Sequence, residues 1–289
     1  MLIVTNKKGL IALKIAFIGD LHYPSMHGKK DMVKESRDEF YHKFLQSFFE
    51  TEADYYVSIG DLTNFGKEDE MQEVYEIIHE YDKRFIHTLG NHDLYGIPRE
   101  KVLDIAKSEQ NFSIETNQAI LIFLETARDH NYEDHSGILS DIQLQWLDGE
   151  LEKSGEKLVI IFAHHPIYNT TTNSNFPYLS IVPEVPIHDI LRKKKGNGIY
   201  VNGHNHHDSI ETIDNWTFVQ ADAVLDDQSI RMIDIKEDEI SIQTLNVQDS
   251  ELERLGQIIG SNIGHFQLNP LGIGTTPNRE KIIKKIIYV

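Results

Sequence analysis

The chain has 289 residues, no cysteine, and 46 acidic against 28 basic side chains, which gives a formal net charge of −18. Its length suits one large α/β domain or two small ones, and its 40% apolar residues can fill a sizeable core, so intrinsic disorder and a disulfide scaffold are excluded. A chain this acidic repels phosphate backbones, which argues against non-specific binding of nucleic acid or of an anionic membrane.

The N-terminal stretch, residues 1–20, contains an apolar run that Lys14 interrupts and that no small-residue cleavage site follows. This pattern is typical of a buried strand and not of a signal peptide or a membrane span. The expected location of the protein is therefore the cytoplasm.

Apolar runs of strand length recur along the chain and alternate with helix-like stretches. The expected strands are residues 14–19, 55–60, 84–89, 119–124, 158–163 and 198–202. Apolar side chains at helical spacing predict helices that include residues 40–49 and 142–151. Buried strands that alternate with amphipathic helices predict an α/β domain whose strands are largely parallel or mixed.

The pattern changes from Trp216 onward, where strands follow one another closely. The expected strands there are residues 216–220, 229–235 and 239–245, which favours β-hairpins over crossovers. We place the main domain at residues 1–245 and treat residues 246–289 as a C-terminal extension of unknown role. Within the extension, residues 249–259 favour a helix, and the basic-apolar end 278–289 favours helical packing on the domain over self-association.

The stretch 168–186 is rich in Thr, Asn, Ser and Pro. It is either a substrate-facing loop beside a functional site or a surface excursion, and the sequence favours neither.

The histidines are unevenly distributed. Seven of the 15 fall in four short clusters, GDLH, GNHD, AHHP and GHNHH, each directly after an apolar run of strand length. A fifth cluster, GDLTN, contributes Asp61 after another such run. Because ligands gather at the carboxyl ends of strands in α/β sheets, we expect the five clusters to converge at one edge of the sheets.

The side chains of these clusters suit metal ions. Carboxylates, neutral imidazoles and an Asn carbonyl form an oxygen and nitrogen donor set that fits Mn, Fe, Zn, Ni or Co. The donors are too many for one structural zinc, which needs four ligands. Two divalent ions that share one carboxylate would use them better, and such a pair clamps the entering and leaving oxygens of an in-line displacement at phosphorus.

The motifs DLH, GDLTN, GNHD, HHP and GHNH, in this order, resemble those of the calcineurin-like metallophosphoesterases, and the resemblance covers about residues 14–235. The segment SGILSDIQLQWLDGEL also resembles the helix that small-molecule members carry before the AHHP strand. The resemblance implies an α/β fold, a four-layer α/β/β/α sandwich of two mixed β-sheets flanked by helices, with a dinuclear site at the rim.

The resemblance also implies roles for individual residues. The residues carried over as metal ligands are Asp20, His22 and His206 for the first ion, Asn91, His164 and His204 for the second, and Asp61 as the bridge between them. His92 would be the general acid or transition-state stabiliser, with Asp93 as its orienting partner. His165, His207 and Asp208 lie next to ligands and are expected to support them or to line the pocket.

Such a centre would reverse the local charge. Two divalent ions carry four positive charges, of which Asp20 and Asp61 cancel two, so a phosphate could bind inside an acidic protein. A hydroxide that bridges the ions would attack phosphorus in line while His92 assists the leaving oxygen.

Two departures from related enzymes bear on the substrate. Asn64 stands where purple acid phosphatases have a metal-binding Tyr and where bacterial cyclic-nucleotide phosphodiesterases often have Asp. The latter also carry an Arg shortly after GNHD, whereas here Leu94, Tyr95 and Gly96 follow. The expected substrate is a small-molecule phosphodiester or a nucleotide-type pyrophosphate, with no nucleic-acid polymer and no membrane as partner. The alternatives are a phosphomonoesterase and, in a different class, a non-catalytic metal-binding or scaffold protein on the same fold.

Overall fold

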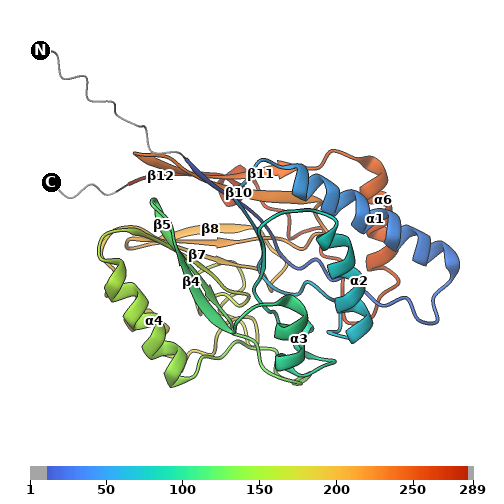
Figure 1. Ribbon diagram of the computed structural model, residues 1–289, viewed down its shortest axis with the longest axis horizontal. Coiled ribbons are helices and arrows are strands. Elements are labelled where there is room, and N and C mark those ends of the chain that lie inside the picture. The colour runs from blue at the N-terminus through green and yellow to red at the C-terminus, as the bar shows by residue number, and fades with distance from the viewer. Residues whose placement is uncertain (1–11, 286–289) are drawn as a thin grey trace, which may run out of the picture.

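The structure, a computed structural model, describes residues 12–285. Two six-stranded sheets pack face to face with helices on both outer sides (Figure 1). This α/β/β/α sandwich confirms the predicted fold class. Residues 1–11, part of the predicted N-terminal strand segment, lie outside the described residues. None of the helices formed by residues 12–285 is long and apolar enough to cross a membrane.

The first sheet combines parallel and antiparallel strands. Its strands, in spatial order, are β12 (Lys281–Lys284), β11 (Glu239–Asn246), β10 (Ser229–Ile235), β1 (Leu13–Ile18), β2 (Tyr55–Ser58) and β3 (Phe85–His87). Strands β1, β2 and β3 run parallel to one another, whereas β10, β11 and β12 are each antiparallel to their neighbours.

The second sheet has a parallel centre and antiparallel edges. Its strands, in spatial order, are β4 (Asn111–Glu115), β5 (Ala119–Leu124), β6 (Leu158–Phe162), β7 (Gly198–Asn202), β9 (Trp216–Gln220) and β8 (Ser209–Ile213). Strands β5, β6, β7 and β9 are parallel, and β4 and β8 close the two edges in antiparallel pairs.

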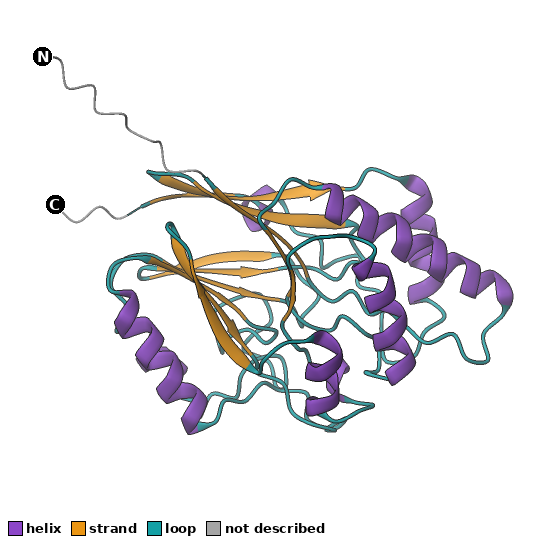
Figure 2. Ribbon diagram, viewed as in Figure 1, coloured by secondary structure: helices purple, strands orange, loops and turns teal. Residues whose placement is uncertain are grey.

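Helices cover the outer faces of both sheets (Figure 2). The helices that share a core with the first sheet are α1 (Asp31–Glu50), α2 (Glu68–His79), α3 (Arg99–Ala106) and α6 (Ser250–Gly260). The second sheet packs against α4 (Asp141–Ser154) and α5 (Ile187–Leu191). Two single-turn elements, η1 (His92–Leu94) and α7 (Thr276–Arg279), lie in the connections.

The alternation of side chains along a strand explains why the central strands β5 and β6 are apolar throughout and β1 almost so. On β1, Ile15 and Phe17 point into the core between the sheets, whereas Ala16 and Ile18 point into the core under the helices. Between the sheets, the rings of Phe123 and Phe162 stack with their centroids 5.3 Å apart. Burial on both faces requires apolar residues at every position, and each large side chain contributes about 1.5–3 kcal/mol when fully buried.

Two expectations for the C-terminal third need correction. Strand β9 lies in the second sheet and β10 in the first, so the chain crosses between the sheets there, whereas the expected hairpin is present between β10 and β11. The expected helix over 278–289 was wrong for its described part, because residues 281–284 form β12, which pairs with β11, and residues 286–289 lie outside the described residues. The two isoleucines of β12 favour a strand, and a segment of four residues is too short for a helical pattern to be distinguished from an alternating one. The predicted helix of the extension is present as α6, which packs on α1.

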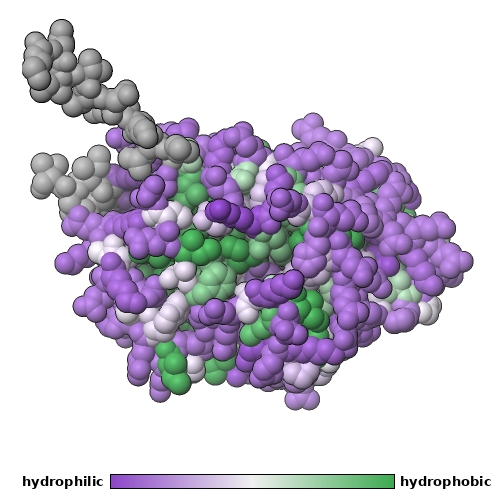
Figure 3. All heavy atoms as spheres, viewed as in Figure 1, coloured by the Kyte–Doolittle hydropathy of each residue, from purple (hydrophilic) through white to green (hydrophobic). Residues whose placement is uncertain are grey.

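The loops that follow β1, β2, β3, β6 and β7 come together where the carboxyl ends of the parallel strands meet. On the face shown in Figure 3, hydrophilic residues dominate, and apolar residues gather where the edges of the two sheets meet. The fold thus brings polar loops from both sheets to a common edge above an apolar interior.

Candidate metal centre

The residues proposed as ligands lie on sharply turned backbone directly after the strands. Five of them have φ between +48° and +72°, namely Asp20, His22, Asp61, His204 and His206. This left-handed conformation costs a non-glycine residue roughly 1–3 kcal/mol, so the surrounding structure must hold it. The backbone N–H of His22 donates to the carbonyl of Asp61 at 2.9 Å, which ties the loop after β1 to the loop after β2.

Glycines allow these loops to approach one another closely. A β-carbon at Gly203 would lie 2.1 Å from Oδ2 of Asp20, and one at Gly90 would lie 2.2 Å from Oδ1 of Asp61. Both carboxylates therefore rest directly on glycine backbone, where no other residue would fit without a shift.

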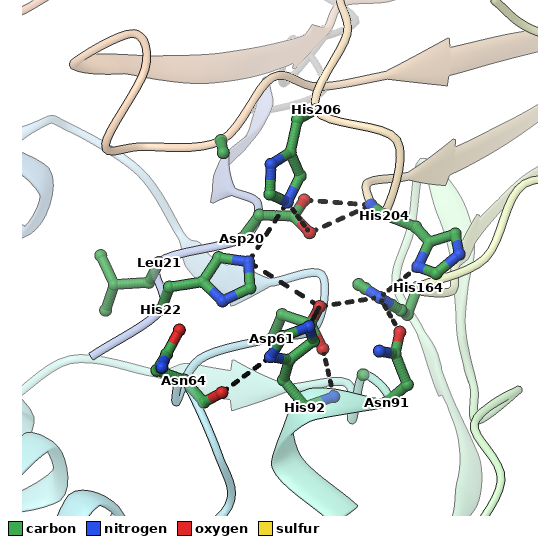
Figure 4. Close-up of polar contacts among 12 residues, drawn as sticks. Asp20, Leu21, His22, Asp61, Asn64, Asn91, His92, His164, His204 and His206 are labelled. Carbon is green, nitrogen blue, oxygen red and sulfur yellow. Dashed lines mark hydrogen bonds and ion pairs between the residues drawn. The ribbon is translucent and has the colours of Figure 1, made fainter. Parts of the chain in front are cut away.

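We call Asn91, His164 and His204 the second-ion group. Their donor atoms meet around Nε2 of His164, with Oδ1 of Asn91 at 3.0 Å and Nδ1 of His204 at 3.2 Å. Oδ2 of Asp61 lies 3.3 Å from the same nitrogen. Figure 4 shows these side chains directed toward one another from loops of both sheets.

The remaining polar atoms of the second-ion group make hydrogen bonds that point outward. Nδ1 of His164 lies 3.1 Å from the carbonyl of Ile59, and Nε2 of His204 lies 3.0 Å from the carbonyl of Tyr178. Since a carbonyl only accepts, each of these ring nitrogens carries the proton. The amide nitrogen of Asn91 donates to the hydroxyl of Tyr95 at 2.7 Å, which orients the amide oxygen inward. When both imidazoles are neutral, the inward atoms of the three side chains and Oδ2 of Asp61 face each other without a proton, which is the donor arrangement of a cation site.

We call Asp20, His22 and His206 the first-ion group. The Nε2 atoms of His22 and His206 are 3.2 Å apart, and Oδ1 of Asp20 is 3.5 Å from Nε2 of His206. Oδ2 of Asp61 is 3.9 Å from Nε2 of His22, so the Asp61 carboxylate borders both groups. The backbone N–H of His204 donates to both oxygens of Asp20 at 3.1 Å, which fixes that carboxylate. All seven proposed ligands thus converge, and the set of oxygen and nitrogen donors fits two transition-metal ions.

The charges of the centre shift the pKa values of its members. Burial opposes ionisation, yet His164 and His92 hold the pKa of Asp61 well below its usual range. Burial likewise disfavours a charged His164 ring, but Asp61 raises the pKa of His164 to about 9. The Asp61 carboxylate therefore attracts positive charge to this buried point, in the form of a proton or of a metal ion.

His92 lies at the side of the first-ion group, and its ring is 4.6 Å from the His22 ring between centroids. Nδ1 of His92 is 2.7 Å from the carbonyl of Asn64, so Nε2 is the nitrogen that faces the centre, 4.0 Å from Oδ2 of Asp61. The backbone N–H of His92 also donates to Oδ1 of Asp61 at 2.8 Å.

The expected pairing of Asp93 with His92 was wrong. The Asp93 carboxylate accepts hydrogen bonds from Thr63, from the backbone of Gly90 and from His87, whose Nε2 lies 2.9 Å from Oδ2. Asp93 therefore ties the loop after β2 to the loop after β3, and the carbonyl of Asn64 orients His92 instead.

The three residues expected beside the ligands bond to neighbouring protein groups. His165 has both ring nitrogens engaged, with the Thr126 hydroxyl at 2.8 Å and the His135 carbonyl at 2.9 Å, so it has no free lone pair for an ion. His207 accepts from Nδ2 of Asn269 at 3.0 Å. Asp208 is buried against Arg231 and accepts from the backbone N–H of Gly274 at 3.1 Å.

Three further residues at the first-ion group lie outside the motifs. Oδ2 of Asp226 lies 3.8 Å from Nδ1 of His206 and has no hydrogen-bond partner of its own among residues 12–285. The Phe266 ring, from the segment after α6, lies 4.9 Å from the His22 ring and 5.2 Å from the His206 ring. Asn269, in the same segment, donates to the carbonyl of His206 at 2.9 Å. No local pattern marks these residues, because their role arises only from tertiary packing.

Comparison with known proteins agrees with this geometry. The family model described as calcineurin-like phosphoesterase matches residues 13–208, more than half of the chain. No curated protein matches the chain. A solved dimetal phosphatase from Danio rerio superimposes with a TM-score of 0.67 at 15% identity, covering 81% of this chain and 96% of that one.

Two other solved structures share the fold at lower similarity. GAP50, the anchor in the inner membrane complex of Plasmodium, gives a TM-score of 0.55 at 12% identity over 83% of this chain and 86% of that one. A purple acid phosphatase from yellow lupin, Lupinus luteus, gives 0.53 at 11% identity over 83% of this chain and 52% of that one. At such identities the likeness concerns the fold alone.

Proposed function

The chain belongs to the calcineurin-like phosphoesterase family and is a metallophosphoesterase with a buried cluster of His and Asp side chains, and from this premise we propose that it hydrolyses a small-molecule phosphodiester or a nucleotide-type pyrophosphate. The observation that carries the proposal is the convergence of seven metal-binding side chains and the Nε2 atom of His92 on one point. When bound, two divalent ions would activate a water molecule and neutralise the charge of the phosphoryl oxygens.

The protein side chains have separate tasks in this reaction. Asp61 and the two ligand groups would hold the ions, and the inward amide oxygen of Asn91 is held by Tyr95. His92, in its protonated form, donates from Nε2 to the leaving oxygen, while its Nδ1–H stays on the carbonyl of Asn64. That hydrogen bond keeps the ring in one orientation before and after the proton leaves.

The charge distribution supports a small diester. No Lys or Arg side chain of residues 12–285 contacts the seven ligands, so a phosphate would be held by the ions and by neutral donors. A diester, with one negative charge, needs fewer cations than a monoester with two. The net charge of −18 opposes a nucleic-acid polymer, which needs a basic track.

One feature favours a second anionic group on the substrate. A cleft of about 270 Å³ is lined by Asn64, by Lys29 and Lys67, and by the carboxylate-bearing Glu70. Its two lysines offer positive charge to a second phosphate of a pyrophosphate, or to a monoester, which keeps a phosphomonoesterase as the second candidate.

The test uses two chromogenic substrates, bis-p-nitrophenyl phosphate and p-nitrophenyl phosphate, with metal-stripped protein reconstituted with Mn²⁺. Asp61→Ala removes the shared carboxylate, and Asp189→Ala removes an exposed carboxylate on α5 as the matched control. We expect metal-dependent turnover of the diester that falls at least about a hundredfold in Asp61→Ala and is unchanged in Asp189→Ala.

Preference for the monoester would favour the second candidate instead. Stoichiometric metal without turnover of either ester would contradict the proposal and favour a non-catalytic metal-binding role.

A further inference from the structure

One histidine at the metal centre has no task in the scheme above. His135 lies in the loop between β5 and α4, outside the five motifs. Its ring packs between the ring of the ligand His204, 5.8 Å away, and the ring of Tyr178, 5.3 Å away. His135 therefore stands beside the second-ion group, whereas His92 stands beside the first-ion group.

The backbone around His135 is fixed to the centre. Its carbonyl accepts from Nε2 of His165 at 2.9 Å, and His165 follows the ligand His164 directly. On the other side, the backbone N–H of Gly137 donates to the carbonyl of Ser180 at 3.0 Å, which joins the loop to the segment that carries Tyr178. The position of the His135 ring is thus set by the same scaffold that sets the second-ion group.

The ring itself has no polar partner. Within residues 12–285 neither ring nitrogen of His135 makes a hydrogen bond or an ion pair, although the ring is half-buried. The ligands His164 and His204 and the acid His92 each have one nitrogen on a backbone carbonyl. A half-buried imidazole that leaves both polar atoms unused beside a phosphate site has its hydrogen-bonding capacity available for a ligand.

The electrostatic surroundings connect the ring to the centre. Burial, followed by the nearby His92 ring, lowers the pKa of His135, while Asp134 and Asp61 oppose that shift. In either protonation state the imidazole offers at least one N–H donor.

We propose that His135 is a substrate-binding residue whose ring N–H donates a hydrogen bond to a phosphoryl oxygen from the side of the second-ion group. The inference rests on the proposed function and adds a second protein contact to the phosphoryl group, on the far side from His92. No proton is transferred in this contact: a ring N–H donor meets an anionic oxygen, and both remain as they were. The ring of Tyr178 limits the orientations available to the imidazole.

The decisive variant is His135→Phe, which keeps a planar ring against Tyr178 and His204 and removes both nitrogens. His135→Gln restores an N–H donor on a shorter side chain. His42→Ala, on the exposed face of α1, is the matched histidine control. A hydrogen bond to a charged group is lost in the first variant, so kcat/KM for bis-p-nitrophenyl phosphate is expected to fall about tenfold to a hundredfold. His135→Gln is expected to recover part of it, and metal content is expected to be unchanged in all three.

A binding measurement separates this inference from the proposed function. Calorimetric titration of the Mn²⁺-loaded protein with inorganic phosphate reports the contact without any turnover. We expect affinity for phosphate to fall by a similar factor in His135→Phe and to stay at the wild-type value in His42→Ala. Equal phosphate affinity of His135→Phe and wild type, or no phosphate binding by either, would overturn the role of His135. Absence of turnover in the wild type with intact phosphate binding would contradict the proposed hydrolysis alone.

Discussion

The two ligand groups of the metal centre differ in how their side chains are held. In the second-ion group every donor is fixed from behind, His164 by the carbonyl of Ile59, His204 by that of Tyr178 and Asn91 by the hydroxyl of Tyr95. In the first-ion group, Nδ1 of His22 is buried without a partner among residues 12–285, and Nδ1 of His206 faces Asp226 at 3.8 Å.

The two groups therefore differ in what orients their ligand side chains. Hydrogen bonds to backbone carbonyls orient the imidazoles of the second-ion group before any ion arrives, whereas packing and one buried carboxylate orient the imidazoles of the first-ion group. The ring of Phe266 supplies much of that packing, and it belongs to the C-terminal extension. We therefore expect the second ion to bind more tightly than the first, and the following variants test that expectation.

The largest effect is expected where the two groups meet. Asp61→Asn keeps the shape of the side chain but removes the charge that both groups face. We expect kcat to fall about a thousandfold and both ions to bind more weakly, because a shared carboxylate stabilises both. Metal analysis after dialysis, together with diester turnover, measures the two effects. Two tightly bound ions in this variant would show that the groups do not depend on Asp61.

Removing one imidazole from each group should separate the two sites. In His204→Ala the protein is expected to lose the second ion and keep the first, and in His22→Ala the reverse. Each change is expected to lower turnover about a hundredfold, because both ions are needed for an in-line displacement. Metal stoichiometry near one in each variant is the expected result. Loss of both ions from either variant would mean that the groups bind cooperatively and cannot be compared as separate sites.

Smaller changes behind the ligands sharpen the comparison. Asp226→Asn removes the charge behind His206 and is expected to lower the affinity for the first ion about tenfold. Tyr95→Phe removes the hydroxyl behind Asn91 and is expected to lower the affinity for the second ion about tenfold. Competition with a fluorescent chelator measures each affinity. The prediction fails if each variant lowers the affinity for the ion of the opposite group.

The second-ion group should also show the stronger competition with protons. The pKa of His164 is raised to about 9, so below that pH the metal-free ring holds a proton that the ion must displace. Apparent affinity for the second ion is then expected to rise about tenfold per pH unit up to pH 9 and to level off above it. Calorimetry at pH 7 in buffers of different ionisation enthalpy should detect about one proton released with that ion. No proton release would contradict the competition.

The smallest effect concerns the extension. Phe266→Leu keeps an apolar side chain but removes the ring contacts with His22 and His206, which together are expected to be worth about 0.5–1.5 kcal/mol. We expect the first-ion affinity to fall roughly twofold to tenfold while the second is unchanged. Leu271→Ala, at a side chain that is 90% exposed in the same segment, is the control. An equal loss in both variants would point to the segment as a whole rather than to the ring.

The sequence was sufficient to predict the fold and the meeting of the motifs. Strands that are apolar at every position mark buried sheets, and polar residues directly after them mark the carboxyl-terminal edge. The loop after β3 and the position of Asn91 in it follow from the same logic, since both are local features.

What the sequence could not predict depends on contacts between distant segments. The carbonyls of Ile59, Asn64 and Tyr178 orient His164, His92 and His204, respectively. Every residue has a backbone carbonyl, so the amino-acid sequence does not indicate which carbonyl accepts a hydrogen bond.

Asp93 illustrates the opposite error. Its place beside His92 in the chain suggests a partner, but the η1 turn directs its carboxylate toward Thr63 and His87. The strand β12 was missed because it exists only by pairing with β11.

The left-handed backbone of five ligands has a consequence for how this protein can change. A chain selected for resistance to heat alone would favour glycine or asparagine at positions 20, 22, 61, 204 and 206, because those residues adopt positive φ most readily. Each such replacement would remove a carboxylate or an imidazole from the centre. Thermostability and metal binding therefore compete for the same positions, and stabilising substitutions compatible with catalysis must be sought elsewhere in the chain.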